Sequence, residues 1–204
     1  MIACQIEVKL IIGYSWRICL KKIFRSYLFL GLVSGLIIAL DQYTKWVVRQ
    51  NLALGESWMP LDWLSPYARI LHWYNTGVAF GLFQNGNTIF AILATLVSLA
   101  IIYYFSKVPA EDWTLRLAMG LQLGGALGNL IDRIVIGHVT DFISVGTFPV
   151  LNIADASITV GVAVLVLGVW MQEKRDKKAR LLAEEQDGSV GDTQKPAAIV
   201  DFHE

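Results

Sequence analysis

Long runs of apolar residues dominate the chain, and short stretches rich in polar and charged residues separate them. A helix needs about 20 apolar residues to cross the roughly 30 Å hydrocarbon core of a bilayer. Four segments have that length and character, so the sequence predicts four transmembrane helices. They run over about residues 24–48, 88–106, 115–136 and 152–171.

Composition favours a membrane protein over a soluble one. The chain is 55% hydrophobic and 17% charged, whereas soluble domains average about 45–50% and about 25%. A soluble protein with so large a core would need more polar residues to cover it. Lys and Arg total 17, as do Asp and Glu. The chain thus has no net basic charge to hold nucleic acid, and no nucleic-acid partner is expected.

Basic residues gather at one side of the predicted helices, and such residues mark cytoplasmic loops. They precede the first helix, join the second to the third and follow the fourth. These residues are Lys21, Lys22, Arg25, Lys107, Arg116, Lys174, Arg175, Lys177, Lys178 and Arg180. Both termini are therefore predicted to be cytoplasmic, with outer loops over about residues 50–87 and 137–150. In the first loop, residues 69–74 have the character of a β-strand.

Three parts make up the predicted domain organisation. Residues 1–23 form an N-terminal cytoplasmic extension, residues 24–175 form the four-helix domain, and residues 176–204 form a polar cytoplasmic tail predicted to be disordered. Cys4 and Cys19 are too few for a disulfide framework or a four-ligand zinc site. The three histidines are scattered along the chain, so neither a metal nor another cofactor is expected.

Three aspartates lie within predicted membrane helices, where a charged residue costs about 2.5–3.5 kcal/mol on insertion scales. With a rise of about 1.5 Å per residue, Asp41 and Asp132 lie near the outer ends of the first and third helices. Asp155 lies near the outer start of the fourth helix, and Asp141 lies in the second outer loop. The sequence therefore predicts that four carboxylates from separate segments converge near the outer surface.

These aspartates differ in their neighbours. Asp41 has a lysine four residues on and Asp132 has an arginine next to it, so a cation can neutralise each of them. Asp141 and Asp155 have apolar neighbours and no adjacent cation. Two carboxylates held close in an apolar site share a proton, so one can activate a water while the other protonates a peptide carbonyl. Spacing leaves an alternative open, because proton-coupled transporters also place carboxylates in their helices.

Five short runs occur in order along the chain. They are residues 41–45 (DQYTK), 75–81 (NTGVAFG), 128–133 (GNLIDR), 139–142 (VTDF) and 148–155 (FPVLNIAD). In sequence and order they resemble the motifs of the lipoprotein signal peptidase (signal peptidase II) family, over about residues 26–175. The resemblance implies an all-α integral membrane protein with four transmembrane helices, a small extracytoplasmic β-cradle and both termini cytoplasmic.

The resemblance also implies a function. It is that of a bacterial inner-membrane aspartyl endopeptidase, which removes the signal peptide from diacylglyceryl-modified prolipoproteins by cleaving before the lipidated cysteine. The active site would lie near the periplasmic face of a monomer, with the diacylglyceryl-prolipoprotein and membrane lipids as partners. The family's catalytic aspartates match Asp141 and Asp155. Its substrate-binding or supporting positions match Asp41, Lys45, Asn75, Asn129, Asp132, Arg133 and Asn152.

Overall fold

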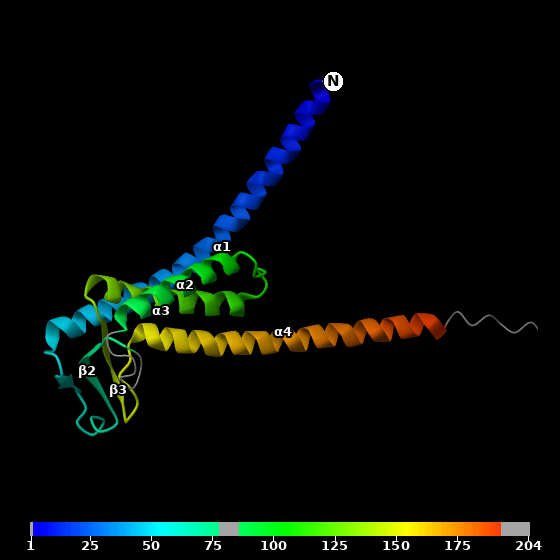
Figure 1. Cartoon of the computed structure of the whole chain (residues 1–204). Coiled ribbons are helices and arrows are strands. Elements are labelled where there is room, and N and C mark those ends of the chain that lie inside the picture. The colour runs from blue at the N-terminus through cyan, green and yellow to red at the C-terminus, as the bar shows by residue number, and fades with distance from the viewer. Residues whose placement is uncertain (1, 78–85, 193–204) are drawn as a thin grey trace, which may run out of the picture. The chain divides into compact units, whose positions relative to one another are not determined.

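The computed structural model describes residues 2–77 and 86–192, with side chains for residues 24–77 and 86–182. It divides into two compact units, Met1–Leu165 and Val166–Glu204. The helices are α1 (Ile2–Asn51), α2 (Asn87–Phe105), α3 (Trp113–Val135) and α4 (Ile153–Asp192), and the strands are β1 (Ser57–Trp58), β2 (Ala68–Asn75) and β3 (Val139–Val145) (Figure 1).

In the first unit, α3 packs against both α1 and α2. Its glycines allow this close approach, since small residues let two helix backbones come together. A Cβ at Gly120 would lie 2.7 Å from the side chain of Val33 on α1, and one at Gly124 would lie 2.7 Å from Ile37. The glycine spacing on α3 therefore sets the contact with α1.

Gly125 faces α4 and supports a prediction about stability. A Cβ at this position would overlap the carbonyl oxygen of Ala154 and lie 2.6 Å from Oγ of Ser157. The Gly125→Ala variant must push α4 away, so we expect it to lose about 1–3 kcal/mol of stability, the usual cost of overpacking. Thermal unfolding in detergent measures this, with Gly35→Ala as the control because a Cβ there meets nothing within 4 Å. Equal melting temperatures for the two variants would contradict the packing described.

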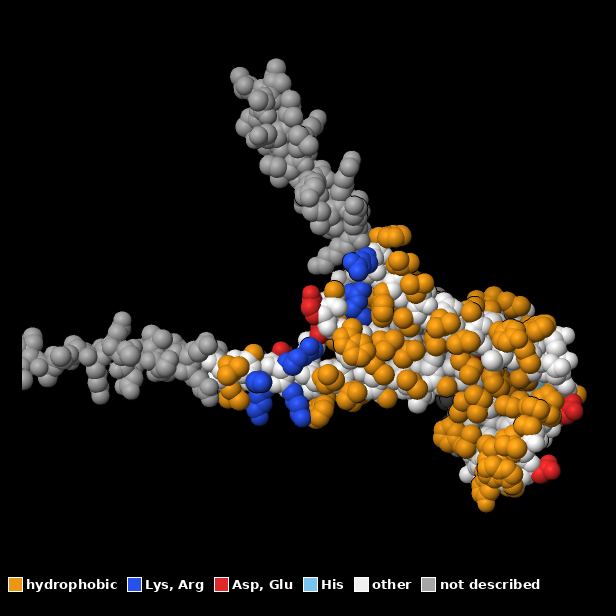
Figure 2. Space-filling model, turned by 180° about the vertical axis from the view of Figure 1, so that it is seen from behind, with side chains coloured by type: hydrophobic (Ala, Val, Ile, Leu, Met, Phe, Trp, Pro, Cys, Tyr) orange, Lys and Arg blue, Asp and Glu red, His pale blue; other side chains and the backbone are white. Residues whose placement is uncertain are grey.

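Apolar side chains lie mainly on the outside of the first unit. The buried hydrophobic cluster is small and consists of Leu30, Ile101, Phe105 and Leu123. By contrast, Leu32 on α1 and Leu96 on α2 are 65% and 57% exposed. Figure 2 shows apolar side chains over much of the visible face of this unit. So large an exposed apolar surface is typical of helices that face lipid.

Three helical segments within the described residues are long and apolar enough to cross a membrane. They are Phe24–Asn51, Asn87–Phe105 and Ile153–Leu182. The segment predicted over residues 115–136 forms α3, which is a helix but carries buried polar groups such as Asn129. The structure confirms a mostly helical protein with apolar spans. The fourth crossing and the side of the termini stay predictions.

A small antiparallel sheet forms within the two predicted outer loops, in the order β1-β2-β3. Strand β2 confirms the strand character predicted for residues 69–74. In the register between β2 and β3, Asn75 pairs with Val139 and Trp73 pairs with Asp141. This register brings the end of β2 beside Asp141.

The second unit contains the rest of α4, which continues as a helix to Asp192. Of the tail predicted to be disordered, residues 176–192 are helical in the structure, while residues 193–204 lie outside the described residues. The stretch from Lys177 is rich in Lys, Arg, Leu, Ala and Glu, which are strong helix formers. Residues 2–23 of the predicted N-terminal extension form the first part of α1, which begins at Ile2.

Candidate active site

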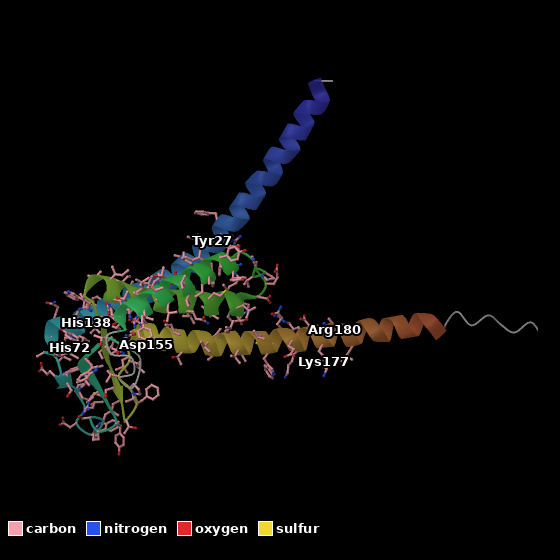
Figure 3. The ribbon with its side chains drawn as sticks, in the orientation of Figure 1. Tyr27, His72, His138, Asp155, Lys177 and Arg180 are labelled. Atoms are coloured by element: carbon pink, nitrogen blue, oxygen red, sulfur yellow. The ribbon has the colours of Figure 1, made fainter. Side chains whose placement is uncertain are left out.

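The four aspartates predicted to converge lie in one polar cluster, built from α1, α3, β3 and the start of α4. Asp41, Asp132 and Asp141 are 0%, 2% and 1% exposed, and Asp155 is half-buried. Figure 3 shows Asp155 at the start of α4, in the first unit (Figure 3). Burial of this kind requires that each charge has a partner.

Lys45 neutralises two of the aspartates and joins α1 to α3. Its Nζ lies 2.8 Å from Oδ2 of Asp41 and 3.1 Å from Oδ2 of Asp132. Arg49 adds a longer contact, 3.7 Å from its Nη1 to Oδ1 of Asp132. The pairing of Asp41 with the lysine one helical turn away is as predicted.

The predicted neutralisation of Asp132 by the adjacent Arg133 is wrong. Neighbouring residues on a helix point about 100° apart and do not face each other. Asp132 points toward α1, where Lys45 and Arg49 are its cations. Arg133, which is also on α3, instead lines a cavity. Its guanidinium lies 5.7 Å from the ring centroid of Phe90.

Asp41 and Asp132 also hold other segments in place through backbone hydrogen bonds. The N–H of Ala154 donates to Oδ1 of Asp41 (2.9 Å), and the N–H of Thr140 donates to Oδ2 of Asp132 (3.1 Å). Gly128 allows the first contact, because a Cβ there would lie 2.7 Å from Oδ2 of Asp41. These two carboxylates therefore fix the first turn of α4 and the start of β3.

Asp141 is held by two amide donors from different elements. Nδ2 of Asn75 donates to its Oδ2 at 2.9 Å, and Nδ2 of Asn152 donates to its Oδ1 at 2.7 Å. Burial, reinforced by the negative charge of Asp155, raises the pKa of Asp141 from 3.8 to about 7, although both amide hydrogen bonds oppose the rise. Asp141 can therefore carry a proton near neutral pH and donate it.

Asp155 belongs to a capping box at the start of α4, in which two residues satisfy each other's backbone donors. The N–H of Asp155 donates to Oδ1 of Asn152 (2.9 Å), and the N–H of Asn152 donates to Oδ2 of Asp155 (3.3 Å). Nδ2 of Asn129 donates to Oδ1 of Asp155 at 2.8 Å. Asn152 thus contacts both Asp141 and Asp155, which brings the two predicted catalytic residues together.

A cavity of about 520 Å³ lies beside Asp155. Its polar lining includes Asn75, Asn129 and Arg133, and apolar side chains of α2, α3, α4, β3 and the segment 148–151 form most of the rest. Residues 78–81, the end of the second motif, lie outside the described residues. The cavity can therefore accept an apolar chain and bring a polar group of it to Asp155.

Sequence reasoning missed Gln42, which lies inside the first motif. Its Nε2 is 3.2 Å from both Oδ2 of Asp41 and Oδ1 of Asp132, and 3.0 Å from the carbonyl oxygen of Gly128. It also missed Thr140, whose Oγ1 accepts a hydrogen bond from Arg49 (3.0 Å). A glutamine directly beside a buried aspartate was the available signal for the first of these.

Two histidines that are far apart in the sequence both contact the ring of Tyr74. The ring centroid of Tyr74 is 5.3 Å from that of His72 and 3.8 Å from that of His138. Burial lowers the pKa of His138, against the opposing effect of Asp132. Within the described residues, no group of three or more His, Cys, Asp or Glu side chains is arranged to hold a metal ion.

Comparison with known proteins identifies the class. The family described as Signal peptidase (SPase) II matches residues 33–171. The chain is 39% identical to the lipoprotein signal peptidase of Shouchella clausii over 152 residues, which are 72% of this chain and 97% of that protein. Identity to the lipoprotein signal peptidase of Bacillus subtilis is 38% over 151 residues, or 72% and 96% of the two chains.

Solved structures agree with this result. Two structures described as bacterial membrane enzymes match with TM-scores of 0.66 and 0.62, at 29% and 30% identity. The first match covers 72% of this chain and 90% of the other, and the second covers 69% and 91%. The protein is thus a membrane-embedded peptidase. The chain belongs to the signal peptidase II family.

Proposed function

We propose that this protein is an aspartyl endopeptidase that removes the signal peptide from diacylglyceryl-modified bacterial prolipoproteins, cleaving before the lipidated cysteine. The observation that carries the proposal is the pair Asp141 and Asp155, both bound by Asn152 beside a largely apolar cavity. The comparisons support the substrate class, because the curated relatives are lipoprotein signal peptidases. They also identify a peptidase family, so the transporter alternative is not carried further.

The proposed reaction is general acid–base hydrolysis by the two carboxyl groups. Asp155, as the carboxylate, takes a proton from a water, and the water oxygen bonds to the carbonyl carbon of the scissile peptide. Asp141, in its protonated form, gives its proton to the carbonyl oxygen. The tetrahedral intermediate then collapses, the C–N bond breaks and the leaving amine takes the proton held by Asp155. The carbonyl forms again as its oxygen returns a proton to Asp141, which restores both side chains.

The remaining residues of the site would position these two groups. Asn75, Asn129 and Asn152 donate hydrogen bonds to the carboxyl oxygens. Asp41, Lys45 and Asp132 form the buried ion network that fixes β3 and α4. Arg133 lines the cavity beside Asp155 and is placed to contact the substrate.

The proposal includes a location and an orientation. We propose four crossings of the bacterial inner membrane, with both termini cytoplasmic, the active site near the periplasmic face and the protein acting as a monomer. The asymmetry of basic residues along the sequence supports this orientation. Exposed aromatic side chains on the loop and sheet suit a membrane interface, where such rings concentrate. They are Trp58, Trp63, Tyr67 and Trp73.

The test is cleavage of a diacylglyceryl-modified prolipoprotein by the purified protein in detergent, with EDTA present. We expect cleavage before the lipidated cysteine and no cleavage of the same prolipoprotein without its lipid. The cavity lining explains the second result, because an unlipidated chain leaves the apolar walls between α2 and α4 unfilled. A folded protein that leaves the lipidated substrate intact would refute the proposal.

The pKa of Asp141 predicts how activity depends on pH. With a pKa raised to about 7, Asp141 holds the proton that it donates below pH 7 and loses that proton above it. We therefore expect kcat/KM to fall as the pH rises through about 7. A pH series with the lipidated substrate in detergent measures this decline.

A stability measurement checks the same assignment independently. Between pH 4 and 7 the native protein binds a proton at Asp141 that the unfolded chain has already released, so its free energy of unfolding decreases as the pH rises. The decrease begins near 3.8, the ordinary pKa, and ends near 7. The Asp141→Asn variant lacks this titration and should show a smaller slope. An unchanged slope would contradict the raised pKa.

A further inference from the structure

The side chain of Asn129 contacts three residues outside α3 through the two ends of its amide group. Its Oδ1 accepts hydrogen bonds from Nζ of Lys45 (2.9 Å) and from Nδ2 of Asn152 (3.1 Å). Its Nδ2 donates to Oδ1 of Asp155 at 2.8 Å. Asn129 is only 6% exposed, so water has little access to replace these partners.

An asparagine amide has nearly the same shape when it is rotated by half a turn, but the rotation exchanges an acceptor with a donor. Asn152 favours the observed orientation, because its own oxygen accepts the N–H of Asp155 and its NH₂ group therefore faces Asn129. Lys45 requires the same orientation, since an ammonium group has donors and no acceptor. Only the oxygen of Asn129 can face it.

Lys45 is itself fixed. It is 0% exposed and lies between Asp41 at 2.8 Å and Asp132 at 3.1 Å. Its position therefore does not depend on the catalytic pair. We propose that Lys45 is a positioning residue that acts through Asn129, holding this amide so that its NH₂ group faces Asp155. The inference rests on the proposed function, because it assigns a role in that reaction.

The orientation matters for the chemistry of Asp155. With Nδ2 toward the carboxylate, Asn129 stabilises the ionised form that accepts a proton from water. In the opposite orientation, an amide oxygen would face a carboxylate oxygen, which favours the protonated form of Asp155. The same amide oxygen keeps Nδ2 of Asn152 in place, and that group donates to Asp141 at 2.7 Å. One cation thereby orders donors to both carboxyl groups.

A purely electrostatic role for Lys45 is the competing explanation. The charged and titratable groups near the pair are Asp41, Lys45 and Arg49 on α1, Asp132 and Arg133 on α3, and the two aspartates themselves. Removing the charge of Lys45 alters the electrostatic potential at the two aspartates whether or not Asn129 is present. The two explanations therefore differ in whether the effect of Lys45 requires Asn129.

A double-mutant cycle separates them, with Lys45→Met and Asn129→Ala measured singly and together on the lipidated prolipoprotein. We expect Lys45→Met to lower kcat by about tenfold or more in the otherwise unchanged protein and by less than about twofold in the Asn129→Ala background. We also expect Lys45→Met to move the acidic limb of the pH–rate profile to higher pH only when Asn129 is present. Equal effects of Lys45→Met in both backgrounds, on kcat and on pH, would overturn the inference.

Folding controls complete the design, because Lys45→Met leaves two buried carboxylates with less neutralisation. Should this variant fail to fold, the cycle is repeated in the Asp41→Asn background, where losing one negative charge balances the lost lysine. The same coupling is expected there, and its absence overturns the inference. If the wild-type protein cleaves the substrate and the cycle shows no coupling, the proposed role of Lys45 is refuted and the proposed function is not. A wild-type protein that does not cleave refutes the proposed function and the inference with it.

Discussion

Replacing either Asp141 or Asp155 by asparagine should abolish cleavage while the protein stays folded. Neither amide can exchange the proton that the proposed reaction requires. General acid–base catalysis contributes about 10²–10⁴-fold to the rate, so kcat should fall by at least that factor. The measurement is single-turnover cleavage of the lipidated prolipoprotein, which detects slow residual activity.

The asparagine variants should keep a melting temperature close to that of the wild type. The substitution preserves volume, and it removes the repulsion between the two carboxylates at the cost of turning one acceptor into a donor. At position 155 the amide oxygen can still accept from the N–H of Asn152, which keeps the capping box at the start of α4. Full activity in either folded variant would exclude that residue from the catalytic pair.

Asp132→Ala should show the opposite behaviour and destabilise the fold strongly. This change leaves the N–H of Thr140 without its acceptor and removes one of the two carboxylates around the buried Lys45. Breaking a buried ion pair by removing one partner costs about 3–5 kcal/mol. Chemical unfolding in detergent measures the loss, and the activity of the surviving folded protein is recorded alongside it.

Two comparisons sharpen this prediction. Asp62→Ala, an exposed aspartate in the outer loop, should change stability by less than about 0.5 kcal/mol. Asp132→Asn keeps an oxygen that can still accept from Thr140, so it should retain part of the activity. If Asp132→Asn were folded and as inactive as Asp155→Asn, the choice of Asp141 and Asp155 as the catalytic pair would have to be reopened.

Much of this architecture could be predicted because the hydropathy of a segment and the geometry of a helix depend only on residues close together in the sequence. The apolar runs predict helices over residues 88–106 and 115–136, and the observed ends of α2 and α3 lie within a few residues of these limits. The rise per residue placed Asp41 and Asp132 at one depth, and the structure finds both in the same cluster. A regular helix makes such positions calculable from sequence alone.

What could not be predicted depends on contacts between distant segments. The cations that pair with Asp132 could not be predicted, because the position of Arg133 next to it in the sequence does not reveal which face of α3 meets α1. The helical continuation of α4 to Asp192 was missed because its polar composition resembles that of a disordered tail, although its residues favour a helix. The orientation of the Asn129 amide follows from its contacts with Lys45 and Asn152, which are distant from it in the sequence.

The hydrogen bond from Ala154 to Asp41 spans 113 residues, and this separation has a consequence for biosynthesis. The first helix is made long before the last, so Asp41 and Lys45 must enter the bilayer without Asp132 or Ala154. Their spacing of one helical turn lets them neutralise each other during insertion. The nascent chain cannot assemble the site until the start of α4 has been synthesised. The protein therefore acquires the arrangement needed for proteolysis only after the start of α4 has been translated.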